Sequence, residues 1–171
     1  VSLYNTGDDR LVKNAINLID FSRQPEGVTL SRHPSYTPQF IPTFSLWYIG
    51  MLQDYSRYAA DIDFIKGKMG GVRQILGYFK SYQLADGSLK NAPQWMFTDW
   101  VDNKEWKSGA GPIGANGTSA VLDLQLLWAY QVAADLENKV GTPAFANQYL
   151  ASIELLKKTI LSHLRGDDNP R

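Results

Sequence analysis

The chain has 171 residues, enough for one domain or part of one, and its 17 basic residues balance 17 acidic ones. Balanced charge without a basic stripe argues against a nucleic-acid partner, and no apolar run is long enough for a membrane span. The absence of cysteine excludes disulfides and thiolate chemistry; with two distant histidines and no H-E-x-x-H motif, neither a metal site nor a cofactor is expected.

The amino-terminal residues are typical of the end of a helix, which Gly7 stops by taking the left-handed position. An amphipathic helix is predicted over residues 9–23, with Asp8 or Asp9 as its N-cap and Pro25 as its end. The last residues, 166–171, have the composition of a linker. These two ends predict a piece cut from a longer protein.

Residues 24–42 form a long, proline-rich connection, and loops of this length are uncommon unless they have a function. Its polar and aromatic side chains include Arg32 and Tyr36, which we take as candidate binding residues. The alternative is a rigid surface loop with assorted polar residues.

The next two predicted helices differ in character. The first begins at Pro42, covers residues 43–58 and is apolar on most sides. The second, residues 61–84, is capped by Asp61 and is amphipathic. Its outer face is expected to carry the basic side chains Lys66, Lys68, Arg73 and Lys80. Its glycines lower helix propensity but could permit close approach of a neighbouring helix; they are Gly67, Gly70, Gly71 and Gly77.

The segment 95–101 concentrates aromatic residues around one carboxylate. It contains Trp95, Phe97, Asp99 and Trp100, and a loop rich in glycine, asparagine and lysine follows it to residue 117. Rings that stack on C–H faces, next to a carboxylate that accepts hydrogen bonds from hydroxyls, suit a sugar. The alternative is a buried aromatic cluster whose aspartate caps a turn.

The last two predicted helices repeat the contrast. Residues 118–138, capped by Thr118 or Ser119, are apolar nearly all round, whereas residues 142–164 are amphipathic, with Thr142 as N-cap and Pro143 in the first turn. A helix that is apolar all round is buried on all sides, so the alternation predicts an all-α fold with inner helices wrapped by outer ones.

The connections follow the same order. Short ones lead from inner to outer helices and long ones from outer to inner helices. The long connections should therefore gather at one end of stacked helical hairpins, where a site would be built.

Four segments of the chain carry a resemblance to a known family. They are Pro25-Glu26-Gly27, Ser31-Arg32-His33-Pro34-Ser35-Tyr36, Phe97-Thr98-Asp99-Trp100, and Gly117-Thr118-Ser119-Ala120 with Leu122-Asp123-Leu124-Gln125. Together they resemble the six-hairpin catalytic domain of bacterial α-L-rhamnosidases over essentially the whole chain, the phenylalanine–any–aspartate–tryptophan element being the most specific part.

The resemblance implies a partial (α/α) toroid, in which residues 1–171 form roughly half of a six-hairpin barrel. It implies a parent glycosidase, periplasmic or extracellular, that removes terminal α-L-rhamnosyl residues with inversion from a rhamnose-containing glycan or glycoside. The family's general-acid and general-base motifs are not present here, so no catalytic residue is expected in this segment, which alone should be inactive and could self-associate.

The sugar contacts implied by the resemblance come from two loops. Trp100 would pack on the sugar and Asp99 would bind or orient its hydroxyls, with Trp95, Arg32 and Tyr36 as further substrate-binding residues.

The carboxylates agree with a binding role. An inverting glycosidase needs two carboxyl groups about 6.5–9.5 Å apart. Asp8, Asp61 and Asp86 are expected at caps or turns, and Asp63, Glu137 and Glu154 on solvated helix faces. Of the carboxylates on the long loops, Glu26, Asp99, Asp102 and Glu105, only Asp99 lies among aromatic residues, where desolvation could tune it. One such carboxylate is not a catalytic pair.

Two other functions remain open from the sequence. One is a helical-repeat module that binds a protein or glycan without catalysis, although such modules have short loops. The other is a different six-hairpin enzyme, such as a glucosidase or a lyase.

Overall fold

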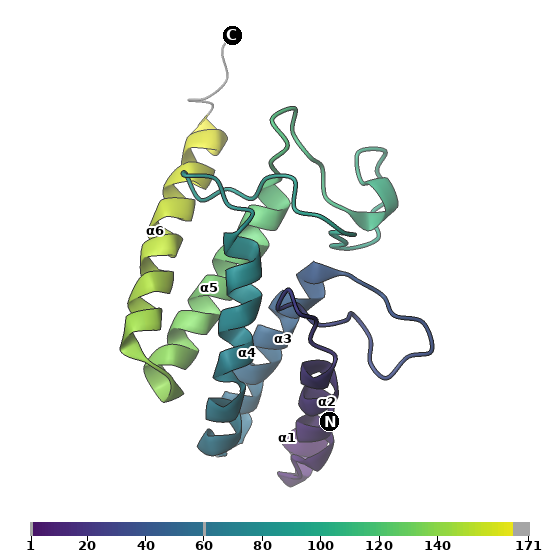
Figure 1. Ribbon diagram of the computed structural model, residues 1–171, viewed down its shortest axis with the longest axis vertical. Helices are drawn as coiled ribbons and strands as arrows, with labels where there is room; N and C mark the ends of the chain where they lie inside the picture. The colour runs from purple at the N-terminus through teal and green to yellow at the C-terminus, as the bar shows by residue number, and fades with distance from the viewer. Residues whose placement is uncertain (1, 60, 166–171) are drawn as a thin grey trace.

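The structure, a computed structural model, describes residues 2–59 and 61–165, and the side chains of 3–59 and 61–162. This part of the chain folds into six α-helices and one short 3-10 helix: α1 Ser2–Thr6, α2 Arg10–Phe21, α3 Pro42–Tyr58, α4 Ile62–Lys80, the 3-10 turn Lys107–Gly109, α5 Ala120–Val140 and α6 Pro143–Arg165 (Figure 1). Extended structure within the described ranges is limited to isolated bridges. The all-α prediction is confirmed; residue 1 and the predicted linker at 166–171 lie outside the described residues.

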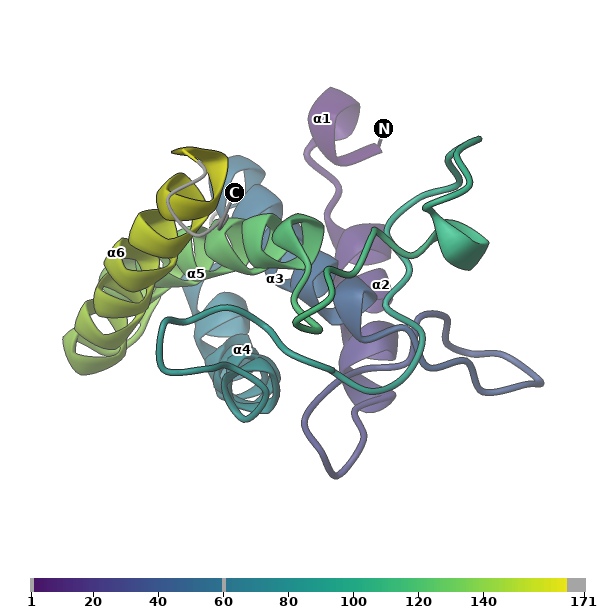
Figure 2. The same cartoon turned by 90° about the horizontal axis from the view of Figure 1, so that it is seen from above.

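The helices form two layers. Helix α3 packs against α2, α4 and α5, and α5 packs against α3, α4 and α6. Figure 2 shows α3 and α5 together, with α2, α4 and α6 around one side of them. The predicted inner helices are therefore the central ones, because each contacts three neighbours.

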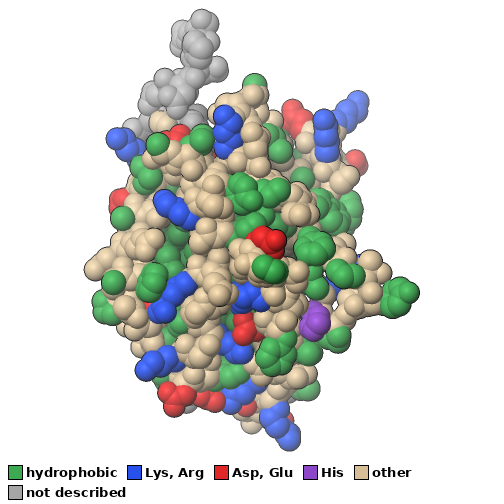
Figure 3. Space-filling view, viewed as in Figure 1, with side chains coloured by type: hydrophobic (Ala, Val, Ile, Leu, Met, Phe, Trp, Pro, Cys, Tyr) green, Lys and Arg blue, Asp and Glu red, His purple; other side chains and the backbone are tan. Residues whose placement is uncertain are grey.

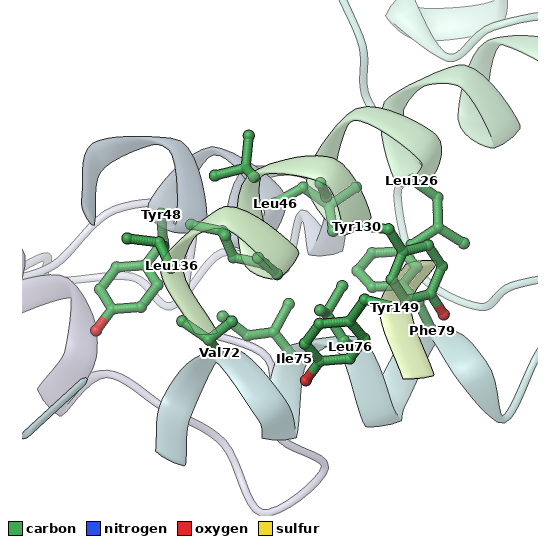
Figure 4. Packing of buried hydrophobic residues seen from close by; sticks show 14 of the residues in the cluster. Leu46, Tyr48, Val72, Ile75, Leu76, Phe79, Leu126, Tyr130, Leu136 and Tyr149 are labelled. Atoms are coloured by element: carbon green, nitrogen blue, oxygen red, sulfur yellow. The ribbon is translucent and has the colours of Figure 1, made fainter. Parts of the chain in front are cut away.

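The hydrophobic core lies between these layers. Side chains of α5 and α6 meet those of α3 and α4 there, and Figure 4 labels ten of them: Leu46, Tyr48, Val72, Ile75, Leu76, Phe79, Leu126, Tyr130, Leu136 and Tyr149. Burial of this apolar surface is the main source of stability for such a helical assembly.

The helix ends follow the predictions only in part. Gly7 has a positive φ of 70° and its N–H bonds to Leu3 O, and Asp61 accepts a hydrogen bond from Phe64 N at 3.0 Å. Asp9 stands at the N-cap of α2, but its carboxylate accepts from the Tyr55 hydroxyl at 2.7 Å instead of capping. The side chain of Ser119 makes no cap bond to α5 either. A tertiary partner thus takes the carboxylate of Asp9, whereas the buried hydroxyl of Ser119 has no hydrogen-bond partner among the described residues.

Helix α4 ends at Lys80, four positions before the predicted end at 84. The residues after Lys80 turn back, so that Gln83 pairs with Leu89 in an isolated antiparallel bridge. The Asp86-Gly87 turn between them is as predicted: Asp86 accepts bonds from the N–H and hydroxyl of Ser88 at 3.0 and 2.7 Å.

The prediction that Lys68, Arg73 and Glu137 face solvent is wrong. Glu137 is buried and takes two hydrogen bonds from Arg73, at 2.8 and 2.9 Å, and one from Thr142 N at 2.6 Å. Lys68 forms an ion pair with Asp20 at 3.0 Å. Their partners lie on other helices, so helical periodicity could not reveal the pairs.

Only one of the four α4 glycines permits the close approach that was considered possible. A Cβ on Gly71 would collide with the Arg23 guanidinium, which bonds to Gly71 O at 3.2 Å. Nothing lies within 4 Å of a Cβ built on Gly67, Gly70 or Gly77. Gly71 thus admits the arginine that joins α2 to α4.

The two long connections, residues 22–41 and 81–119, lie at the same end of the molecule, whereas the short connections lie at the other (Figure 1). The second is fixed to α5 because Leu89 N donates to the buried carboxylate of Asp123 at 2.7 Å. Acidic and basic side chains are interspersed over the face shown in Figure 3. Among the described residues, no helix is both long and apolar enough to cross a bilayer.

Candidate functional site

The segment 95–101 forms an aromatic cluster, by which we mean Trp95, Phe97 and Trp100. The Phe97 ring lies 5.2 Å from that of Trp95 and 5.1 Å from that of Trp100, both edge to face, and the two indoles are 6.2 Å apart. Trp100 remains 70% exposed. The cluster thus presents an indole to solvent on a support of two other rings.

The 3-10 turn Lys107–Gly109 holds this cluster in place. Thr98 N and Asp99 N both donate to Gly109 O, at 2.8 and 3.2 Å, and the Trp95 indole N–H donates to Ser108 O at 2.9 Å. Gly109 has a φ of 75°, and a Cβ there would collide with the Phe97 ring. Glycine is therefore required at this position.

The cluster is joined to the first turn of α3. The hydroxyl of Thr43 donates to Phe97 O, and the Phe44 ring lies 6.0 Å from the Phe97 ring. Within the segment, the side chain of Met96 is buried. These contacts place the aromatic cluster at the amino-terminal end of an inner helix.

A pocket of about 310 Å³ opens between the amino-terminal ends of α3 and α5, and we call it the α3/α5 pocket. It is lined by Thr43, Leu46, Trp47, Leu124, Gln125 and Trp128. The indoles of Trp47 and Trp128 lie 4.9 Å apart, and a Cβ on Gly50 would come within 2.6 Å of Trp128. Thr43 lines this pocket and bonds to the aromatic cluster, so the two features adjoin.

The carboxylate of Asp99 is exposed at the edge of the cluster and accepts a hydrogen bond from Trp100 N at 2.8 Å. The expectation that surrounding rings desolvate Asp99 is therefore wrong: the rings of Trp95, Phe97 and Trp100 pack on one another. The remaining acceptor capacity of the carboxylate is open to solvent, where it could accept hydroxyl groups.

Arg32 and Tyr36 lie on the other long connection. Ser31 N donates to Gln39 O at 3.0 Å, which closes the base of a loop that carries both residues outward. Tyr36 is fully exposed and Arg32 is exposed. Neither forms a hydrogen bond, ion pair or ring contact with the aromatic cluster, so the structure brings Trp95, Asp99 and Trp100 together and leaves these two apart.

The residues that line the α3/α5 pocket are not among those predicted from the sequence to contact a sugar. Trp47 and Trp128 were assigned to helices expected to be buried on all sides, whereas Trp47 is 53% exposed. The sequence did contain a signal for this pocket: both helices carry more apolar residues than one core-facing stripe needs. Within the described residues, no group of three or more acidic or histidine side chains could hold a metal ion.

A comparison with models of known protein families finds no match, and a comparison with curated proteins finds none either. Solved structures do match. The chain superposes on a GH78 family rhamnosidase of Bacillus sp. GL1 with a TM-score of 0.77 and 20% identity, over 94% of this chain. It superposes on a rhamnosidase from Klebsiella oxytoca with rhamnose bound with a TM-score of 0.68 and 19% identity, over 86% of this chain.

The chain thus has the fold of one part of these two enzymes. It spans 16% of the length of the Bacillus protein and 28% of the Klebsiella protein. The expected structural likeness to rhamnosidases is confirmed for an all-helical segment.

Proposed function

We propose that residues 1–171 form part of the catalytic domain of a glycoside hydrolase that removes terminal α-L-rhamnosyl residues with inversion. In this proposal the segment supplies sugar contacts, and the general acid and general base come from other parts of the parent protein. The observation that carries it is the exposed indole of Trp100, supported by two rings and adjoining an indole-lined pocket. The shared fold of the two rhamnosidases supports it.

The residues have distinct roles in the proposal. Trp100 offers a flat apolar face to the sugar C–H groups, with Trp95 behind it. Asp99 accepts hydrogen bonds from sugar hydroxyls, since its carboxylate is free on its solvent side. Arg32 and Tyr36 reach the sugar only when the loop 31–39 closes over it.

The open faces of α3 and α5 support an incomplete six-hairpin barrel. Trp47 and Leu124 are 53% and 52% exposed, although both lie on inner helices. Apolar patches of this kind normally mark a surface that another element covers. In the proposal the remaining hairpins of the parent domain pack there, and the α3/α5 pocket becomes a wall of the sugar site.

Kinetics of the parent enzyme on an aryl α-L-rhamnoside test the roles of Trp100 and Asp99. Trp100→Ala removes stacking worth about 1 kcal/mol or more and should lower kcat/KM at least fivefold. Asp99→Asn weakens charge-assisted hydrogen bonds worth about 1.5–3 kcal/mol and should lower kcat/KM about tenfold or more. Trp106→Ala and Asp102→Asn, on the same loop, are the matched controls and should have small effects.

Three outcomes would contradict the proposal. If the parent tolerates both substitutions without kinetic change, the aromatic cluster is structural. If the purified 171-residue chain itself hydrolyses the rhamnoside and Asp99→Asn abolishes turnover, Asp99 is catalytic and the division of labour is wrong. A parent that binds rhamnosides but never cleaves them would instead be a binding module.

A further inference from the structure

A second pocket lies on the other side of the first turn of α3, and we call it the rim pocket. Its volume is about 450 Å³, within the range of small-molecule sites. Pro42 lines the rim pocket and Thr43 lines the α3/α5 pocket, but no residue lines both. Its walls join the two long connections to the end of α4, near which hydrophobic side chains gather in Figure 3.

The hydroxyl of Tyr78 is the unusual group in this wall. Tyr78 is 8% exposed, and its buried oxygen has no hydrogen-bond partner among the described residues. Of the four other buried tyrosines, three donate their hydroxyls: Tyr48 to Asp20, Tyr55 to Asp9 and Tyr130 to Gln83. Buried polar groups are rarely left unsatisfied, so this hydroxyl is suited to a ligand that enters the pocket.

Tyr78 keeps its proton over the neutral range. Burial, and then the neighbouring Tyr82 and Glu26, raise the pKa of Tyr78 to about 12. The group is therefore both a donor and an acceptor, as a ligand hydroxyl requires.

Other groups in the rim pocket complement it. The side-chain amide of Gln24 has one N–H donated to Ser22 O at 2.7 Å, which leaves its oxygen and its second N–H for a ligand. The amide of Gln94 and the carboxylate of Glu26 add further donors and acceptors, and the rings of Phe40 and Tyr82 add apolar surface. Gln94 holds a φ of 73°, which is strained for a non-glycine residue and is often found at binding sites. No basic residue lines the pocket, which disfavours an anion.

We propose that the rim pocket binds a neutral polyhydroxylated molecule of the size of a sugar ring, with the Tyr78 hydroxyl and the two amides bonding its hydroxyls. A quaternary ammonium ion would satisfy Glu26 and the rings, but it would offer no hydrogen bond to Tyr78, Gln24 or Gln94. A sugar ring uses both kinds of surface. The proposal is independent of the function proposed above, because none of Trp95, Asp99 and Trp100 lines this pocket.

Nuclear magnetic resonance of the ¹⁵N-labelled 171-residue chain tests this proposal, with L-rhamnose and D-glucose as sugar probes and choline as the cationic probe. At least one sugar should shift the side-chain amide signals of Gln24 and Gln94 saturably. Tyr78→Phe removes only the hydroxyl and should weaken this binding about tenfold, as expected for one lost hydrogen bond. Trp106→Ala, which lies outside both pockets, should leave it unchanged.

Three results would overturn the proposal. They are sugar-induced shifts confined to the indole signals, shifts produced by choline and by neither sugar, and an unchanged sugar affinity of Tyr78→Phe. Should Tyr78→Phe fail to fold, Glu26→Gln, which alters an exposed side chain, should weaken sugar binding about threefold or more. Unchanged affinity of Glu26→Gln would then overturn the proposal in the same way.

Discussion

Helix α5 has two apolar faces with different surroundings. Leu126, Ala129 and Ala133 are fully buried against the neighbouring helices, whereas Leu124, two positions before Leu126, is 52% exposed beside the α3/α5 pocket. Helix α3 shows the same contrast between buried Ile49 and exposed Trp47. One apolar face of each inner helix therefore makes the core of this chain, and the other is free to build a site or receive another element.

The largest expected effect separates the two faces directly. Leu126→Ala removes a fully buried side chain and should lower the free energy of unfolding by about 3 kcal/mol. Leu124→Ala, the same change on the open face, should alter it by less than about 0.5 kcal/mol. Urea denaturation of both variants measures the difference, and similar losses would show that the open face is also part of the core.

The buried ion pair offers the next comparison. Glu137→Gln leaves Arg73 without its charged partner and weakens the bond from Thr142 N, and it should cost about 2 kcal/mol. Glu154→Gln, which affects an exposed pair with Lys157, should cost less than about 0.5 kcal/mol. Equal losses of stability in thermal denaturation of the two variants would show that the Arg73–Glu137 pair between α4 and α5 is no more important than the exposed pair.

Acidification should lower the free energy of unfolding by protonating Asp20, which pairs with Arg23 and Lys68. Burial opposes ionisation of Asp20, but hydrogen bonds from Arg23 and Lys68 outweigh it and hold the pKa of the carboxyl below its ordinary value of 3.8. Because the folded-state pKa is the lower one, this stabilisation is complete above the ordinary value and is lost as pH falls through the folded pKa.

Asp20→Asn should therefore lower stability at pH 7 by about 1.5 kcal/mol and flatten the acid dependence of unfolding below about pH 4. Asp54→Asn, next to Arg57 on the exposed side of α3, should leave the profile as it is. A wild-type profile unchanged by Asp20→Asn would show that the ion pairs of Asp20 with Arg23 and Lys68 do not contribute to stability.

The smallest effect on folding is expected at the open face. We predict that the 171-residue chain self-associates through this surface, because Trp47 and Leu124 expose apolar area there. Trp47→Lys should reduce self-association with little loss of unfolding free energy. Sedimentation that shows a monomer over the whole concentration range for the wild type would disprove the prediction.

Much of the architecture could be predicted from local pattern. Gly7, Pro42 and Asp61 marked helix boundaries because their effects involve only neighbouring backbone. The order of short and long connections correctly indicated the end where the loops gather. The grouping of Trp95, Phe97 and Trp100 was also accessible, since they lie within one short segment.

The sequence by itself thus determined the helices, their alternation in polarity and the aromatic segment, since each depends on residues within a few turns of one another. Only the tertiary structure decided which carboxylates meet a cationic partner, because Glu137 meets Arg73 across 64 positions and Asp20 meets Lys68 across 48. It also decided which apolar face stays open, and that the Tyr78 hydroxyl lacks the partner that Tyr48, Tyr55 and Tyr130 have. Such contacts depend on where distant segments meet, and no local pattern encodes that meeting.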